Sequence, residues 1–314
     1  MLRPPQPQNR PTPARPGDAV IGRAFVRSLA VILLIVLGGG GYGLWRLVST
    51  SGRPTQITPL SPPAPLVVST AEVPEARFTD ITATAGLKFV HRNGAYGDKL
   101  LPETMGGGVA FFDFDNDGDP DLLFVNATAW PWQPGDDRPP GTMALYRNEG
   151  RGNFADVTAG SGLDVSFYGM GVAVGDYDND GRPDVFLTAV GPNHLFHNDG
   201  GGHFTEVTAA AGVAGLPDEW STSAAWIDFD NDGRLDLFVA NYVRWSRDID
   251  FEVDYRLVGI GRAYGPPMNF PGTFPYLYHN EGGGHFTDVS ARSGVQIKNP
   301  ATGEIGRASC RERV

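Results

Sequence analysis

The sequence predicts an all-β fold, namely a β-propeller of four-stranded blades, and two repeated phrases support this prediction. The first phrase is an acidic loop with the pattern Asp-x-Asp-Asn-Asp-Gly-x-x-Asp, which occurs at residues 113–121, 176–184 and 228–236. The second phrase is Phe-x-Asp/Glu-Val-Thr/Ser, which closes a hairpin at residues 154–158, 204–208 and 286–290. Short runs of β-branched and aromatic residues flank the acidic loops and are typical of buried strands. Four strands recur in a unit of about 50 residues, which is the size of one propeller blade.

An apolar segment near the N-terminus precedes the repeats. Residues 1–27 are rich in proline and arginine, which predicts a disordered segment. Residues 28–45 contain no charged residue, and as a helix they would span roughly 27 Å, enough for the apolar core of a bilayer. They are therefore predicted to form a transmembrane signal-anchor helix. Six prolines between residues 54 and 74 predict that residues 46–75 form an extended linker.

The arginines before the apolar segment predict its orientation in a membrane. Positive charge is retained on the cytoplasmic side, so we expect residues 1–27 in the cytoplasm and the body outside the membrane, in the periplasm or at the cell surface. A cleaved signal peptide is the alternative, and it would release the body as a secreted protein. Both interpretations make the body extracytoplasmic.

The body, residues 76–304, is predicted to be an incomplete propeller of about three blades. A first copy of the second phrase, at residues 78–82, predicts one additional strand. Relative to the second repeat, the first and third repeats contain insertions near residues 127–141 and 242–274. Residues 305–314 fit no repeat and resemble a translated sequencing adapter, so we expect this chain to be an N-terminal fragment of a longer protein.

The acidic loops predict calcium sites. Converging carboxylates repel one another unless a cation lies between them, and an all-oxygen ligand set suits Ca²⁺. An EF-hand is excluded, because the glutamate it needs at loop position 12 is replaced by Phe124, Leu187 and Val239. The aspartate at position 9 is expected to close each site instead. The predicted ligands are the side chains at positions 1, 3, 5 and 9 and the main-chain carbonyl at position 7: Asp113, Asp115, Asp117, Asp119 and Asp121; Asp176, Asp178, Asp180, Arg182 and Asp184; Asp228, Asp230, Asp232, Arg234 and Asp236.

Composition and the remaining motifs narrow the class of function. A formal net charge of −11 without a basic patch in the body argues against nucleic-acid binding. His197 and His279 occupy a hairpin position that Arg147 holds in the first repeat, so we expect surface roles for them and no catalytic role. The sequence shows no nucleophile–base pair, paired catalytic carboxylates or cofactor motif, so we expect no enzymatic activity. A propeller-based enzyme of polysaccharide or small-molecule metabolism is the alternative.

The insertion at residues 242–274 is the predicted recognition surface. It mixes aromatic residues with arginine, a combination favoured at interfaces, and long loops on a rigid scaffold often bind ligands. The candidate residues are Tyr242, Arg244, Trp245, Arg247 and Tyr264. A lid that packs over neighbouring blades is the alternative. Together these features predict a membrane-tethered, extracytoplasmic, calcium-binding module for a protein or glycan ligand, with a role in binding or adhesion.

The two phrases together resemble FG-GAP/VCBS repeats. Residues 101–112, 241–246 and 277–280 are similar to motifs of the cartilage acidic protein-like family, also called ASPIC/UnbV, and the similarity covers about residues 76–300. The resemblance implies an extracytoplasmic, seven-bladed propeller with Ca²⁺ in the blade loops. It implies little about an activity.

Overall fold

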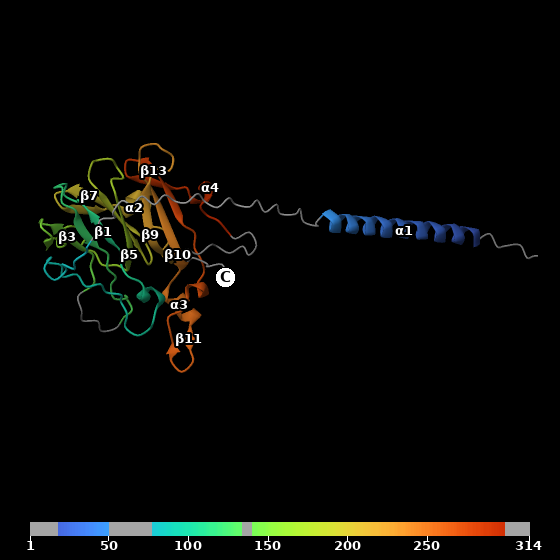
Figure 1. Cartoon of the computed structure of the whole chain (residues 1–314), viewed down its shortest axis with the longest axis horizontal. Coiled ribbons are helices and arrows are strands. Elements are labelled where there is room, and N and C mark those ends of the chain that lie inside the picture. The colour runs from blue at the N-terminus through green and yellow to red at the C-terminus, as the bar shows by residue number, and fades with distance from the viewer. Residues whose placement is uncertain (1–17, 50–76, 134–139, 299–314) are drawn as a thin grey trace, which may run out of the picture. The chain divides into compact units, whose positions relative to one another are not determined.

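The computed structural model describes residues 18–49, 77–133 and 140–298 (Figure 1). The chain divides into two units, Met1–Ala76 and Arg77–Val314. Most of the predicted linker and the predicted adapter, residues 305–314, lie outside the described residues.

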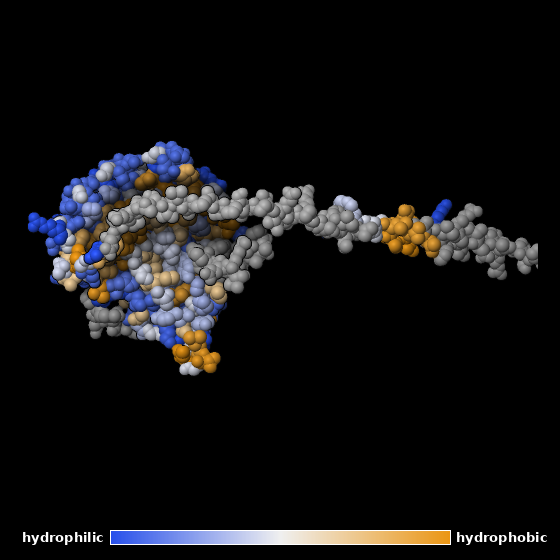
Figure 2. Space-filling model, in the orientation of Figure 1, coloured by the Kyte–Doolittle hydropathy of each residue, from blue (hydrophilic) through white to orange (hydrophobic). Residues whose placement is uncertain are grey.

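In the first unit, the described residues form helix α1 (Asp18–Ser49). The helix contains the predicted apolar segment and is longer at both ends: residues 18–27 were predicted to be disordered and residues 46–49 to be linker. No proline lies between Pro16 and Pro54, so no residue in this stretch lacks a backbone donor. The described aliphatic side chains between Leu29 and Leu37 are exposed, and they form the apolar band on α1 in Figure 2. Among the described residues, no helix combines the length and the apolar character needed to cross a membrane.

The second unit contains three four-stranded antiparallel sheets, as the blade prediction requires (Figure 1). Each acidic loop joins the first two strands of a sheet, as predicted. Sheet 1 consists of β1 (Val109–Phe112), β2 (Asp121–Phe124), β3 (Ala144–Asn148) and β4 (Phe154–Asp156). Sheet 2 consists of β5 (Gly169–Gly175), β6 (Asp184–Ala189), β7 (His194–Gly200) and β8 (His203–Glu206). Sheet 3 consists of β9 (Glu219–Ile227), β10 (Asp236–Arg244), β13 (Tyr276–Gly282) and β14 (His285–Asp288). The strands described in residues 77–133 and 140–298 do not close into a propeller ring.

Two of the apolar cores lie between neighbouring sheets and hold them together. Alternate residues of a strand point to opposite faces of its sheet, and β6 is buried at every position. Val185 and Leu187 contribute to the core between sheets 1 and 2. Phe186 contributes to the core between sheets 2 and 3. Because each buried Leu, Val or Phe side chain stabilises a fold by about 1.5–3 kcal/mol, sheet 2 is central to the stability of the body.

The additional strand predicted at residues 78–82 is not formed, and this prediction was wrong. These residues have irregular backbone that leads into a turn, and Phe78 is 96% exposed. The equivalent phrases form β4, β8 and β14, each of which pairs with the hairpin strand before it. No such hairpin precedes residue 78 among the described residues, so a strand here would leave its backbone groups unpaired.

The insertion of the third repeat folds as a small subdomain beside sheet 3. It contains α3 (Arg247–Val253), the hairpin of β11 (Arg256–Leu257) and β12 (Gly261–Arg262), and the 3-10 helix η2 (Pro267–Asn269). The carboxylate of Asp250 accepts the backbone N–H of Leu101 at 2.9 Å. Leu101 begins the 3-10 helix η1 (Leu101–Thr104), so the insertion is fixed to the segment before β1. Two further short helices, α2 (Thr208–Ala211) and α4 (Ser290–Ser293), follow β8 and β14.

Candidate functional site

The three acidic loops share one backbone conformation, which the first aspartate fixes. We call residues 113–121, 176–184 and 228–236 loops 1, 2 and 3. In loop 2, the two carboxylate oxygens of Asp176 accept the backbone N–H groups of Asp180 at 3.0 Å and Gly181 at 2.9 Å. The first aspartates of loops 1 and 3 make the same two contacts. The fourth and sixth residues are asparagine and glycine in every loop, and all have the positive φ that these two residue types tolerate best.

The aspartate at position 9 joins each loop to its hairpin and is fully buried. In loop 2, Asp184 accepts the backbone N–H groups of Tyr177 at 3.2 Å and Asn198 at 2.8 Å. Burial raises the pKa of Asp184 to about 6, and it also raises the pKa of Asp121 in loop 1. A buried carboxylate is stable in its charged form only where hydrogen bonds or positive charge compensate its lost hydration.

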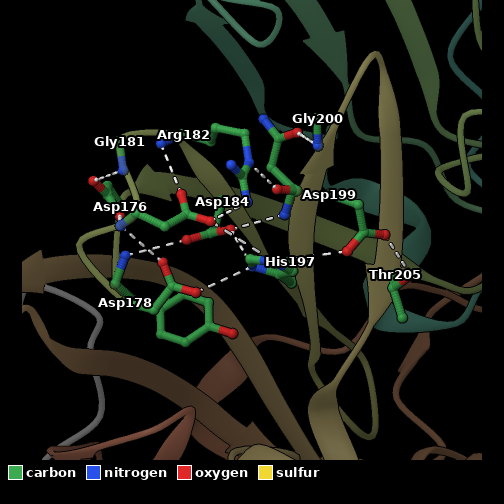
Figure 3. Close-up of polar contacts among 12 residues, drawn as sticks. Asp176, Asp178, Gly181, Arg182, Asp184, His197, Asp199, Gly200 and Thr205 are labelled. Carbon is green, nitrogen blue, oxygen red and sulfur yellow. Dashed lines mark hydrogen bonds and ion pairs between the residues drawn. The ribbon is translucent and has the colours of Figure 1, made fainter.

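Carboxylates at positions 1, 3 and 9 come together in every loop. One oxygen from each lies within 4.8 Å of the others, and Figure 3 shows this convergence for Asp176, Asp178 and Asp184. Burial, followed by repulsion from neighbouring carboxylates, raises the pKa of Asp115 and of Asp178. In loop 1, Oδ1 of Asp115 is buried without a hydrogen-bond partner among the described residues. Mutual repulsion, an unpartnered oxygen and an all-oxygen donor set fit a hard cation such as Ca²⁺.

The predicted ligands at positions 5 and 7 do not all join these groups. Asp180 and Asp232, at position 5, lie instead with a histidine of the adjoining hairpin, and in the described part of the chain Asp117 belongs to neither kind of group. At position 7, the side chains of Arg182 and Arg234 form ion pairs with the position-5 aspartates. These arginines neutralise part of the charge of loops 2 and 3, whereas loop 1 has Asp119 in their place. The main-chain carbonyls of the residues at position 7 remain predicted ligands of the calcium ion.

Two histidines for which the sequence predicted only surface roles lie beside the loops. Nδ1 of His197 is 3.2 Å from Oδ1 of Asp184 and 3.4 Å from Oδ2 of Asp178. Nε2 of His279 is 3.0 Å from Oδ2 of Asp230. Burial alone would lower the pKa of His279, but hydrogen bonds to Asp230 and Glu281 raise it above its ordinary value. The signal in the sequence was the hairpin position itself, which holds a nitrogen-bearing side chain in every repeat.

Asparagine side chains connect neighbouring loops, and sequence reasoning missed this role too. Nδ2 of Asn116 in loop 1 donates to the carbonyl of Gly181 in loop 2 at 3.1 Å, and Nδ2 of Asn179 in loop 2 donates to the carbonyl of Gly233 in loop 3 at 3.1 Å. The buried hairpin residue Asn198 donates to the carbonyl of Phe114 in loop 1 at 2.9 Å. Loop 2 is therefore hydrogen-bonded to both loop 1 and loop 3.

The predicted recognition residues differ in their surroundings. Tyr242 is half-buried against Trp220, with ring centroids 5.2 Å apart. Arg244 pairs with Asp218, its Nε lying 3.0 Å from Oδ2. The hydroxyl of Tyr264 donates to Oε2 of Glu103 at 3.3 Å. These contacts agree with the lid interpretation of the insertion.

Trp245 and Arg247 differ from the other three predicted residues, because both line one cavity. Trp245 is 4% exposed, and its indole Nε1 donates to Oδ2 of Asp250 at 2.7 Å. Arg247 is exposed and lies at the start of α3.

Comparison with known proteins identifies the repeats. A family model described as an FG-GAP-like repeat matches residues 113–187 and 176–239, which contain all three loops. The chain carries FG-GAP-like repeats. It is also 34% identical over 104 residues to cartilage acidic protein 1 of Xenopus tropicalis, and this alignment covers 32% of the present chain. The alignment covers 16% of that relative, so the chain matches only a small part of its length. Both resemblances expected from the repeated phrases are confirmed.

Proposed function

We propose that this protein is a calcium-stabilised module that binds a protein or glycan ligand, as in adhesion, and that it has no catalytic activity. The observation that supports calcium binding is the convergence of the carboxylates at positions 1, 3 and 9 in all three loops. The FG-GAP-like repeats support a binding or adhesion role. In each loop these three aspartates would hold the ion, which would compensate the charge of one buried and two more exposed carboxylates.

Calcium titration of the full chain tests this proposal. Calorimetry should show uptake of three ions, one for each loop. Calcium removal with a chelator should lower the melting temperature, because an ion that binds only the folded state stabilises it. Asp178→Ala should abolish uptake by loop 2. Asp180→Ala should have a smaller effect, since Asp180 pairs with Arg182 outside the converging group. Asp248→Ala, at an exposed position of α3, is the control for the loss of one negative charge. No calcium uptake at millimolar concentration would contradict the proposal.

We also propose that the first unit attaches the body to a membrane, with the body on the extracytoplasmic side. Support comes from the exposed aliphatic side chains of α1 between Leu29 and Leu37 and from the arginines that precede them in the sequence. Protease added outside intact cells should remove the body and spare residues 1–27. Protection of the body would contradict this orientation, and soluble body without added protease would favour a cleaved signal peptide.

A further inference from the structure

A cavity of about 420 Å³ lies at the strand ends opposite the acidic loops, and we call it the aromatic pocket. Its walls come from the segments that follow β2, β6 and β10 and from those that precede β5 and β9. All three sheets therefore contribute to one concave site. Its volume is within the range of known small-ligand sites, which are mostly apolar with a few polar groups.

Four aromatic side chains form a fixed stack in this pocket. The ring of Trp130 lies parallel to that of Tyr168, with centroids 4.0 Å apart, and to that of Trp132, with centroids 5.1 Å apart. The centroid of Trp245 is 5.0 Å from that of Trp130. Trp130, Tyr168 and Trp245 are buried, whereas Trp132 is only half-buried. The stack therefore presents its outer ring, Trp132, to a ligand.

The polar atoms of the buried rings are committed to acceptors inside the protein. Nε1 of Trp130 donates to Oε1 of Glu103 at 3.2 Å, and the hydroxyl of Tyr168 donates to the carbonyl of Asn93 at 2.6 Å. Nε1 of Trp245 is bonded to Asp250 as described above. These contacts hold the rings in place before a ligand arrives, which lowers the entropic cost of binding. These three side chains therefore have no hydrogen-bond donor left for a ligand, and they can contact a ligand only through their ring faces.

Arg247 places a positive charge over this aromatic surface. Its guanidinium carbon lies 5.5 Å from the ring centroid of Trp132. The other arginines at residues 244, 256 and 262 form ion pairs with Asp218, Asp254 and Asp250. No carboxylate within the described part of the chain pairs with Arg247. Its planar fork of donors is therefore available to a carboxylate of a ligand, which it can bind through two parallel hydrogen bonds.

We propose that the aromatic pocket binds a uronic acid residue of an acidic glycan. The C–H face of the sugar ring would pack on Trp132 and its carboxylate would pair with Arg247. The hydroxyl of Ser246 accepts the N–H of Ile249 and keeps its own hydrogen for a sugar hydroxyl. A proline-rich peptide is the competing ligand for an aromatic groove, but a proline-rich segment itself offers no carboxylate to Arg247. This inference rests on the proposed binding function and specifies the ligand.

Titration of the full, calcium-loaded chain with a short oligomer of galacturonic acid tests this inference. The carboxyl-reduced, neutral form of the same oligomer is the matched ligand control. The acidic oligomer should bind, and the neutral form should bind about 10- to 100-fold more weakly, as expected for loss of a hydrogen-bonded charge. Arg247→Gln should weaken binding of the acidic oligomer to the same extent, and Arg247→Lys should restore part of it. Trp132→Ala should weaken both oligomers. Arg256→Gln, on the exposed β11 hairpin, should change neither.

Several outcomes would overturn the inference. Binding that survives both Arg247→Gln and Trp132→Ala would place the ligand elsewhere. Because uronates themselves bind Ca²⁺, loss of binding in Asp178→Ala but not in Arg247→Gln would assign the ligand to the acidic loops. Binding of an acidic proline-rich peptide through Arg247, without binding of the oligomer, would make the ligand a protein. Normal calcium uptake with no oligomer binding would refute this inference alone, whereas absence of calcium uptake would refute the proposed function.

Discussion

Glu103 is a buried carboxylate outside the acidic loops. It is 4% exposed, and its carboxylate accepts hydrogen bonds from Trp130 and Tyr264. Burial raises its pKa above the ordinary value of 4.5 in spite of these donors. The folded protein thus holds this proton more tightly than the unfolded chain does. The stabilisation from the protonated form is complete below pH 4.5 and is lost as the pH rises through the folded pKa.

Replacement of Glu103 by glutamine should therefore change the pH dependence of stability. Glutamine keeps the shape and most hydrogen bonds but carries no charge to desolvate. The free energy of unfolding of Glu103→Gln, relative to wild type, should increase between pH 4 and pH 7 in urea titrations. Glu252→Gln, at an exposed position of α3, controls for the removal of one negative charge. A relative stability that stays constant, or that falls with pH, would show that burial does not determine this pKa.

At the residue scale, the sequence predicted contacts within a loop better than contacts between loops. The convergence of Asp176, Asp178 and Asp184 follows from spacing and a tight turn, both of which are local properties. The positions of His197 and Asn198 could not be predicted in the same way, because they depend on how a hairpin packs against a loop of its own or of the preceding repeat. Repetition marked both positions in the sequence. Because the first repeat has Arg147 in place of a histidine, we expected only a surface role for His197.

At the scale of elements, strand prediction succeeded where a partner strand was present. Apolar runs on both sides of the loops became paired strands, since their side chains fill two cores. Residues 78–82 have the same local pattern but no partner among the described residues, and they did not form a strand. The insertion at residues 242–274 has no periodicity, so its α3 helix and its β11–β12 hairpin were not predicted. Strand propensity depends on such tertiary context.

The glycines that follow the second phrase provide a test of how the elements pack. Gly86, Gly162, Gly212 and Gly294 occupy equivalent positions and share a left-handed φ between 77° and 85°. A Cβ atom at Gly162 would lie 2.0 Å from the carbonyl oxygen of Phe204, and one at Gly86 would lie 2.6 Å from that of Phe154. At Gly212 the nearest such atom is 3.6 Å away, and at Gly294 no atom of the described residues lies within 4 Å.

Alanine at these four positions should consequently destabilise the protein to different degrees. Gly294→Ala and Gly212→Ala should lower the free energy of unfolding by about 1–2 kcal/mol, which is the cost of the left-handed conformation. Gly162→Ala should lower it by about 2 kcal/mol more, because a backbone contact must move, and Gly86→Ala should be intermediate. Urea denaturation of the four variants measures the order. Equal losses at all four positions would mean that the close approach between repeats is not present in solution.

At the scale of the whole molecule, sheet 2 connects the other two sheets. It faces both apolar cores, and loop 2 is hydrogen-bonded to loops 1 and 3. The sequence predicted three equivalent repeats. It could not show that sheet 2 contacts both of the other sheets, because these contacts form only when the sheets pack side by side. A substitution in sheet 2 should therefore affect stability more than the same substitution in sheet 1.

The first aspartates of loops 1 and 2 allow a direct comparison. Asp113 and Asp176 each accept two backbone N–H groups, at 3.0 and 2.8 Å in loop 1 and at 3.0 and 2.9 Å in loop 2, so alanine removes the same local contacts from both. Opening of loop 1 disturbs the bonds from Asn116 and Asn198. Opening of loop 2 disturbs three bonds, which come from Asn116, Asn179 and Asn280. Asp176→Ala should lower the free energy of unfolding by about 1 kcal/mol more than Asp113→Ala, the value of one additional hydrogen bond. The comparison should be made in the presence of a calcium chelator, so that ion binding does not contribute. An equal or smaller loss in Asp176→Ala would show that the three loops are energetically independent.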